Sequence, residues 1–281
     1  SGEPQSNRRR PGRTGQTTFN MESLEERNLH MYPFHRTRGI LIAVIVFIAL
    51  VAIAGAAASP VLSAEGQGNP PDPQPLPPTG IGWLDNIYYG AVPPQSDQAP
   101  VLVFVHGLGR TAKDWWTASG EYGVNDMYAA AYQAGYRTAF VTLDFPENEP
   151  PHNMWDNGET LSRQLKAITG YYGVDQVDIV GHSKGGIDAQ AAIVYYGAWQ
   201  QVRSVFTLGT PHQGAELADL LYSDWADWLA ELLGGRNDAT LSMTTDYMQS
   251  FRALTDPRPE DDAVKYYSGA CLLYTSDAAD E

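Results

Sequence analysis

The 281-residue chain is almost devoid of cysteine and poor in basic residues. Its one cysteine, Cys271, can form neither an internal disulfide nor a cysteine zinc cluster. Lys and Arg number 18 against 33 Asp and Glu, and seven of those 18 precede Glu65, compared with four of the acids. The rest of the chain is therefore strongly acidic. That charge argues against nucleic acid or an anionic membrane as a partner and suits solubility outside the cell.

Several kinds of signature motif are also missing. The chain has no internal repeat and no zinc, phosphate-loop or dinucleotide-binding pattern. Four acids lie in or near expected loops: Asp144, Asp156, Glu159 and Asp175. Their spacing matches no calcium-binding loop, so we expect solvated loop residues. No cofactor is therefore expected, and a structural calcium ion is an alternative that the sequence does not indicate.

The most informative stretch is a β-branched run that breaks into a G-x-S-x-G pattern. It reads VDIVGHSKGG over residues 177–186 and continues into small, helix-forming residues. Strand, sharp turn and helix in this order are typical of a nucleophile elbow, which holds a serine where a base can take its proton. Ser183 is the candidate nucleophile. Gly181 and Gly185 are expected to be glycine because strand and helix approach each other there.

A second motif supports the first. The apolar run Val101–Val105 has strand length, is typical of a parallel strand covered on both faces, and ends in HGLG at residues 106–109. An oxyanion hole needs one backbone NH after the nucleophile and one from the loop after an earlier strand. The NH groups of Leu108 and Lys184 are the candidates.

The histidines near these motifs are expected to be structural. His106 is predicted to brace the oxyanion loop through hydrogen bonds, with Gly107 in the same supporting role, and a catalytic His106 is the alternative. His182 is adjacent to Ser183 in sequence, so its side chain points elsewhere and is not expected to be the base.

With these motifs the chain resembles the secreted bacterial lipases and carboxylesterases of the α/β-hydrolase superfamily. The similar segments, within about residues 86–270, are VFVHGLGR, NMWDNGETL, DIVGHSKGG and TLGTPHQGAELADL. The resemblance implies hydrolysis of carboxylic esters through an acyl-enzyme, on acyl glycerols or similar lipids. The alternatives are a polyester depolymerase, an amidase or peptidase, and a non-catalytic, surface-tethered binding domain that keeps the elbow without a working triad.

Strand and helix patterns alternate between residues 101 and 270. The expected strands are Val101–Val105, Arg137–Leu143, Val177–Val180, Val202–Leu208 and Ala263–Tyr267. The expected helices are Asp126–Ala134, Glu159–Tyr171 and Gly186–Ala198. This order predicts an α/β-hydrolase fold, with a mostly parallel, doubly wound sheet, a helical cap or lid, and Ser183 at the carboxyl end of a strand.

The acid and the base of a triad are not assigned by the sequence. In the family that the chain resembles, the histidine follows the last strand, whereas His212 follows the strand after the nucleophile helix and is the only histidine after Ser183. We predict a structural or pocket-lining role for His212. Eight aspartates between residues 219 and 262 are formal candidates for the acid. We expect both groups beyond the end of this chain, with the sheet truncated before its last strands, because residues 271–281 resemble a translated sequencing adapter.

Residues 31–64 have the features of an export signal. A positive region at residues 35–38 precedes an apolar core at residues 40–54 and a small-residue cleavage pattern at residues 56–58. A cleaved signal and secretion are predicted, and an anchor through residues 39–58 is the alternative.

A candidate lid follows His212. Apolar residues recur there at helical spacing: Leu217, Leu220, Leu221, Trp225, Trp228, Leu229, Leu232 and Leu233. Such a helix could open at a lipid interface, or it could be docked permanently beside the pocket.

The sequence does not indicate an oligomeric state. The expected organisation is residues 1–30 as untranslated or leader sequence, 31–64 as signal or anchor, 65–80 as an extended, disordered Pro-rich linker, 81–270 as an incomplete catalytic domain with 214–255 as lid or cap, and 271–281 as adapter.

Overall fold

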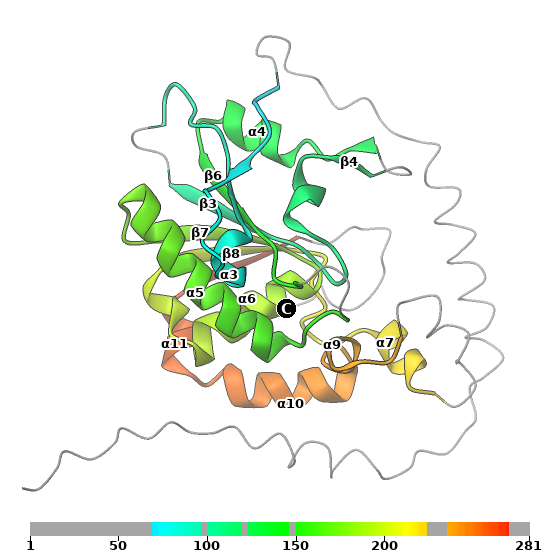
Figure 1. Cartoon of the computed structure of the whole chain (residues 1–281). Helices are drawn as coiled ribbons and strands as arrows, with labels where there is room; N and C mark the ends of the chain where they lie inside the picture. The colour runs from blue at the N-terminus through cyan, green and yellow to red at the C-terminus, as the bar shows by residue number, and fades with distance from the viewer. Residues whose placement is uncertain (1–68, 97–99, 120–122, 146–149, 224–234, 270–281) are drawn as a thin grey trace, which may run out of the picture. The chain divides into compact units, whose positions relative to one another are not determined.

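A seven-stranded sheet forms the centre of the described part of the chain (Figure 1). The computed structural model describes residues 69–96, 100–119, 123–145, 150–223 and 235–269. The strands lie in the order β1-β2-β6-β3-β7-β8-β9. Their bounds are β1 Gln74–Pro75, β2 Ile87–Tyr89, β3 Val101–Val105, β6 Arg137–Val141, β7 Val177–His182, β8 Val202–Leu208 and β9 Lys265–Gly269. Strands β1 and β2 run antiparallel to their neighbours, and the other pairs are parallel.

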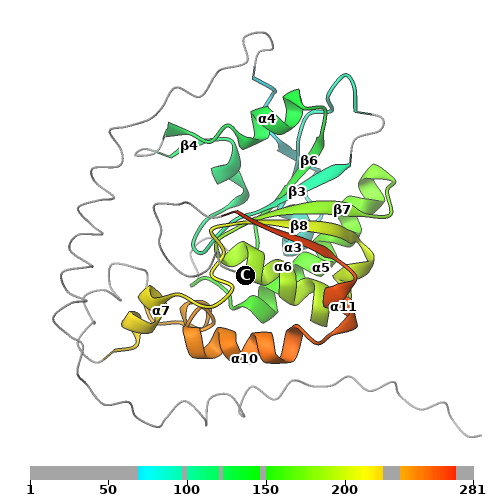
Figure 2. The same ribbon diagram turned by 180° about the vertical axis from the view of Figure 1, so that it is seen from behind.

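Helices cover both faces of this sheet. Figures 1 and 2 show α5 and α6 on one face and α4 on the other, with β9 next to β8. The helices are α3 Gly82–Asp85, α4 Met127–Gln133, α5 Met154–Tyr172, α6 Lys184–Tyr195, α7 Glu216–Leu221, α9 Asp238–Leu241, α10 Thr245–Thr255 and α11 Pro259–Asp262. The 3-10 turns η1 Ala112–Trp115 and η2 Ala198–Gln200 and a two-stranded ribbon of β4 Ala118–Ser119 and β5 Gly123–Val124 complete the described elements.

Strand β3 shows why the sheet is buried on both sides. Val101, Val103 and Val105 belong to the core cluster shared with α5 and α6. Phe104 faces the opposite way and stacks on Phe140 in a second cluster. Each such side chain contributes roughly 1.5–3 kcal/mol when fully buried. The predicted mostly parallel, doubly wound sheet is confirmed. The loops at the carboxyl ends of its strands therefore follow strands that are packed in a core on both faces.

The amino-terminal edge of the sheet differs from the prediction. Residues 69–80 were expected to belong to a disordered linker, but Gln74 and Pro75 form β1 and pair with Tyr88 and Tyr89 of β2. The Tyr128 hydroxyl of α4 also donates to the carbonyl of Pro71 over 2.9 Å. The expectation of disorder is therefore wrong for the part of the linker that pairs with β2.

The candidate lid is described only in part. Helix α7 ends at Leu221, so the continuous helix expected through Leu233 stops there, and residues 224–234 lie outside the described part of the chain. The expected leader, signal and adapter segments also lie outside it. In the portion that the structure describes, no helix combines the length and apolar character needed to cross a bilayer.

Candidate active site

Ser183 occupies a strained turn between β7 and α6. Its φ is 51° and its ψ is −129°, and it is the only non-glycine residue with positive φ in the described part of the chain. Such a backbone costs on the order of 1–3 kcal/mol and persists only where its surroundings enforce it. The Ser183 NH donates to the carbonyl of Leu208 over 2.9 Å, and the Gly186 NH donates to the Ser183 carbonyl over 3.1 Å. These bonds hold the serine at the carboxyl end of β7.

Close backbone contacts leave no room for side chains around this turn. A Cβ atom on Gly185 would lie 2.4 Å from the carbonyl oxygen of His106. A Cβ atom on Gly181 would lie 3.0 Å from the Cα of Gly186. The close approach expected at Gly181 and Gly185 is therefore present. At Gly185 the neighbour is the end of β3, so the glycine brings α6 against the start of the oxyanion loop.

The predicted oxyanion loop, residues 106–109, passes directly beside the serine. A Cβ atom on Gly107 would lie 3.0 Å from the Cβ of Ser183. The loop then turns back, with Gly109 at φ 62° and the Arg110 NH donating to the Gly107 carbonyl over 3.3 Å. Leu108, which supplies one candidate NH, lies in this turn and packs on the core cluster that contains Met154 and Ile187.

The second candidate NH belongs to the helix that follows the serine. Lys184 is the first residue of α6, so its NH has no acceptor within the helix. The amino end of a helix also carries a partial positive charge, which stabilises a developing oxyanion. The two candidate donors thus come from segments that flank Ser183 on two sides.

His106 braces the oxyanion loop. Its Nε2 accepts a hydrogen bond from the Leu143 NH over 2.9 Å, which assigns the ring proton to Nδ1. Nδ1 then donates to the Gly107 carbonyl over 2.8 Å. Burial lowers the pKa of His106, so the ring is neutral at pH 7. Both ring nitrogens are engaged, and these bonds link the end of β3 to the end of β6.

His212 does not form a triad with the described groups. Its Nε2 lies 3.1 Å from the Thr207 hydroxyl of β8. Burial, with a smaller contribution from Arg252, lowers the pKa of His212 to about 4. No carboxylate in the described part of the chain hydrogen-bonds to this ring. The base of the predicted triad therefore stays unassigned.

Two of the candidate acids have other partners. Asp219 accepts hydrogen bonds from the NH and the hydroxyl of Thr245 over 2.9 and 2.8 Å, and so joins α7 to the start of α10. Asp261 accepts hydrogen bonds from Tyr266 and Gln190 over 2.8 and 3.2 Å. Asp224 and Asp227 lie outside the described residues. Nowhere in the described ranges do three or more His, Cys, Asp or Glu side chains group around a metal position.

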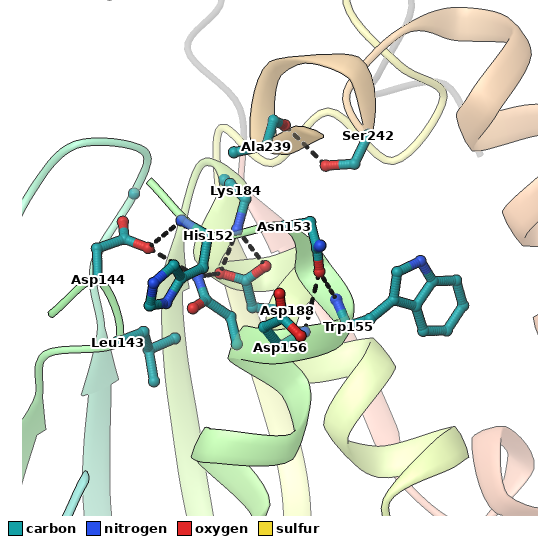
Figure 3. A network of polar contacts seen from close by, with 12 residues as sticks. Leu143, Asp144, His152, Asn153, Trp155, Asp156, Lys184, Asp188, Ala239 and Ser242 are labelled. Atoms are coloured by element: carbon teal, nitrogen blue, oxygen red, sulfur yellow. Dashed lines mark hydrogen bonds and ion pairs between the residues drawn. The ribbon is translucent and has the colours of Figure 1, made fainter. Parts of the chain in front are cut away.

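A buried polar network lies beside the elbow (Figure 3), and its central ion pair is not predicted from the sequence. The Lys184 ammonium binds both carboxylate oxygens of Asp188 over 2.7 and 2.9 Å. The Asn157 side-chain amide donates to Asp188 over 3.0 Å and to Asp144 over 3.2 Å. Asp144 also accepts from the His152 NH over 2.9 Å, so it is not the solvated loop acid that was expected. The available signal was a lysine and an aspartate four residues apart in a helix that otherwise consists mostly of small and apolar residues.

The match to a solved lipase settles the family. A Bacillus licheniformis lipase, BlEst2 in its mature form, is 42% identical with a TM-score of 0.57, and the match covers 65% of this chain and 70% of that chain. The chain belongs to the α/β-hydrolase family of lipases and esterases. The family model for a PGAP1-like alpha/beta domain matches residues 95–226 of this chain, a range that contains the predicted oxyanion loop, the elbow and His212.

Two curated relatives match a shorter stretch of this chain. Triacylglycerol lipases of Pseudarthrobacter phenanthrenivorans and Burkholderia plantarii are each 30% identical over 128 residues, or 43% of this chain. The match covers 35% and 32% of those proteins. The matched part of the chain thus spans about a third of the length of these relatives.

Proposed function

We propose that this α/β-hydrolase cleaves carboxylic esters through an acyl-enzyme on Ser183. The Ser183 oxygen attacks the ester carbonyl, the alcohol leaves, and water then hydrolyses the acyl-enzyme and releases the acid. The single observation that carries the proposal is the strained Ser183 turn with the Gly107 backbone packed against it. Strain of this kind gathers at functional sites, where the fold holds a reactive group in place.

The proposed oxyanion hole consists of the NH groups of Leu108 and Lys184. Removing one such donor typically lowers kcat by a factor on the order of 10²–10³. The Ser183 proton must pass to a base, and neither His106 nor His212 is assigned that role, because the described bonds of both rings go to other groups. The proposed substrates are acyl glycerols or similar lipid esters, the class named in the curated relatives.

The serine substitution tests the proposal. In a version of the protein that also carries the acid and base of the triad, Ser183→Ala should lower the hydrolysis of a short chromogenic ester by a factor on the order of 10⁶, because acyl transfer depends on the Ser183 oxygen. A fluorophosphonate probe should label the unchanged protein and leave the variant unlabelled. Ester turnover of the variant close to that of the unchanged protein, with clean background controls, would refute the proposal.

We also propose that the protein is exported. The apolar stretch and small-residue pattern of residues 40–58 support export through a cleaved signal. Expression in a bacterium should then release a product that begins near Ser59 or Glu65 into the periplasm or medium. Amino-terminal sequencing checks the start, and a membrane-bound product that retains residues 40–58 would establish an anchor instead.

A further inference from the structure

The Lys184–Asp188 ion pair is buried at a place where it is energetically unfavourable. The exposed fractions of the two side chains are 1% and 2%. Removing two charges from water costs several kcal/mol per ion before their attraction is counted. The ammonium also lies on the first residue of α6, where the helix dipole disfavours a cation, and the basic residue precedes the acid, the weaker order for an i,i+4 pair. Stability alone gives no reason for charges here.

The pair lies at one end of a polar connection between the two halves of the proposed oxyanion hole. From Asp188 the hydrogen bonds pass through Asn157 of α5 to Asp144. Asp144 directly follows Leu143, whose NH binds the His106 ring at the start of the oxyanion loop. The Lys184 charge is also near enough to lower the pKa of His106, after the larger effect of burial.

The residues of this connection come from four separate segments of the chain. Lys184 and Asp188 belong to α6, Asn157 to α5, Asp144 to the loop after β6 and His106 to the loop after β3. A hydrogen-bonded, fully buried charge pair has one favourable arrangement, whereas apolar side chains of similar volume can repack in several. The pair is therefore suited to fixing a geometry.

We propose that the Lys184 and Asp188 side chains are positioning residues that hold the first turn of α6 in register with the oxyanion loop, so that the Lys184 and Leu108 NH groups point at one site. This inference rests on the proposed ester hydrolysis. Lys184 then has two functions, because its NH binds the oxyanion and its ammonium fixes the direction of that NH.

A double-mutant cycle on the full chain tests this role. Lys184→Met and Asp188→Asn conserve volume, and each single variant leaves one buried polar group without its charged partner, so each should unfold at a clearly lower temperature. The double variant should regain most of the wild-type melting temperature. Its kcat for a chromogenic ester should still fall by a factor on the order of 10–100, with KM within about twofold, because misplaced donors weaken transition-state binding.

Amide hydrogen exchange gives a readout that does not depend on turnover. The double variant should exchange at least about tenfold faster at residues 106–109 and 181–187 than the unchanged protein, because local opening there becomes easier. Glu159→Gln/Arg163→Gln removes an exposed i,i+4 ion pair on α5 and should change neither kcat nor exchange. If the first double variant does not fold, Lys184→Met/Asp188→Leu replaces it.

The outcomes separate this inference from the proposed function. A folded double variant with wild-type exchange rates at both segments overturns the inference, whatever its kcat. A protein that also carries the acid and base of the triad and still shows no ester turnover refutes the proposed function, and the exchange comparison then decides alone whether the pair fixes the elbow.

Discussion

At the scale of single residues, the glycines of this protein differ sharply in what they tolerate. Gly185 faces backbone oxygens of both Val105 and His106, at 2.8 and 2.4 Å from an added Cβ atom. Gly170, inside α5, has nothing within 4 Å of the same position. The first glycine is fixed by the active-site backbone, and the second only weakens a helix.

These two glycines predict opposite changes in stability. Gly185→Ala should lower the free energy of unfolding by about 1–3 kcal/mol, because the clash is with backbone that cannot rotate away. Gly170→Ala should raise it by about 0.5–1 kcal/mol through helix propensity. Denaturant unfolding measures both. A Gly185→Ala protein as stable as Gly170→Ala would mean that β3 and α6 are not in close contact.

The sequence predicted the residues whose environment is local. Ser183, Gly181 and Gly185 lie in one short strand-turn-helix pattern, so their geometry follows from neighbours along the chain. Asp188 does not, because its importance depends on burial against Asn157, which is 31 positions away in the sequence. From the sequence alone, Lys184 and Asp188 are equally consistent with a solvent-exposed pair.

At the scale of elements, helix α5 shows how tertiary packing overrides local signals. This helix was expected to start at Glu159, and the preceding Asn157 and Gly158 are residue types that favour turns. The helix instead begins at Met154 and continues through both. A Cβ atom on Gly158 would lie 3.1 Å from the Cβ of Ala191, so the glycine lets α5 and α6 pack closely.

The start of α5 depends on one capping side chain. The Asn153 side chain accepts hydrogen bonds from the NH groups of Trp155 and Asp156 over 2.9 and 3.0 Å (Figure 3). Asn153→Ala should therefore lower the free energy of unfolding by about 1 kcal/mol, whereas Asn153→Asp should cost little. Chemical denaturation of both variants checks this. Equal losses in the two would show that the acceptor oxygen is not what matters.

At the scale of the whole molecule, one buried acid should leave a mark on the pH dependence of stability. Burial raises the pKa of Asp188 to about 6 from 3.8, although Lys184 opposes the rise. Between about pH 4 and pH 6 the folded protein therefore binds more protons than the unfolded chain. The contribution of this group to stability is full below about pH 4 and is lost as the pH rises to about 6.

The raised pKa of Asp188 predicts that the wild-type protein and Asp188→Asn differ in how the free energy of unfolding changes from about pH 4 to pH 7. From pH 4 to pH 7, Asp188 should lower the free energy of unfolding by on the order of 3 kcal/mol, and Asp188→Asn should lack that component. Groups that do not contact Asp188 contribute equally to both proteins, so the difference between their profiles reports Asp188 together with its partner Lys184. Parallel profiles from pH 4 to pH 7 would show that its pKa is not raised.

The central strands of the sheet were more predictable from the sequence than its amino-terminal edge. The parallel core strands are continuous apolar runs, and the expected ranges of β3 and β8 match the structure at both ends. Strand β1 was not expected, because Pro-rich segments usually remain extended and unpaired. It forms because Gln74 and Pro75 pair with the backbone of β2. No local sequence pattern shows that this partner strand is available.

Strand β1 also affects strand pairing between copies of this protein. Within the described residues, the two-residue β1 is the edge strand on this side of the sheet. Pro75 has no NH to donate to a further strand, whereas an unpaired β2 would present a template for edge-to-edge pairing with another molecule. A version trimmed to begin at Ile81, the predicted start of the catalytic domain, would remove this cap together with the bond from Tyr128 to Pro71. We therefore expect the segment that resembles a spacer to reduce edge-to-edge pairing between copies.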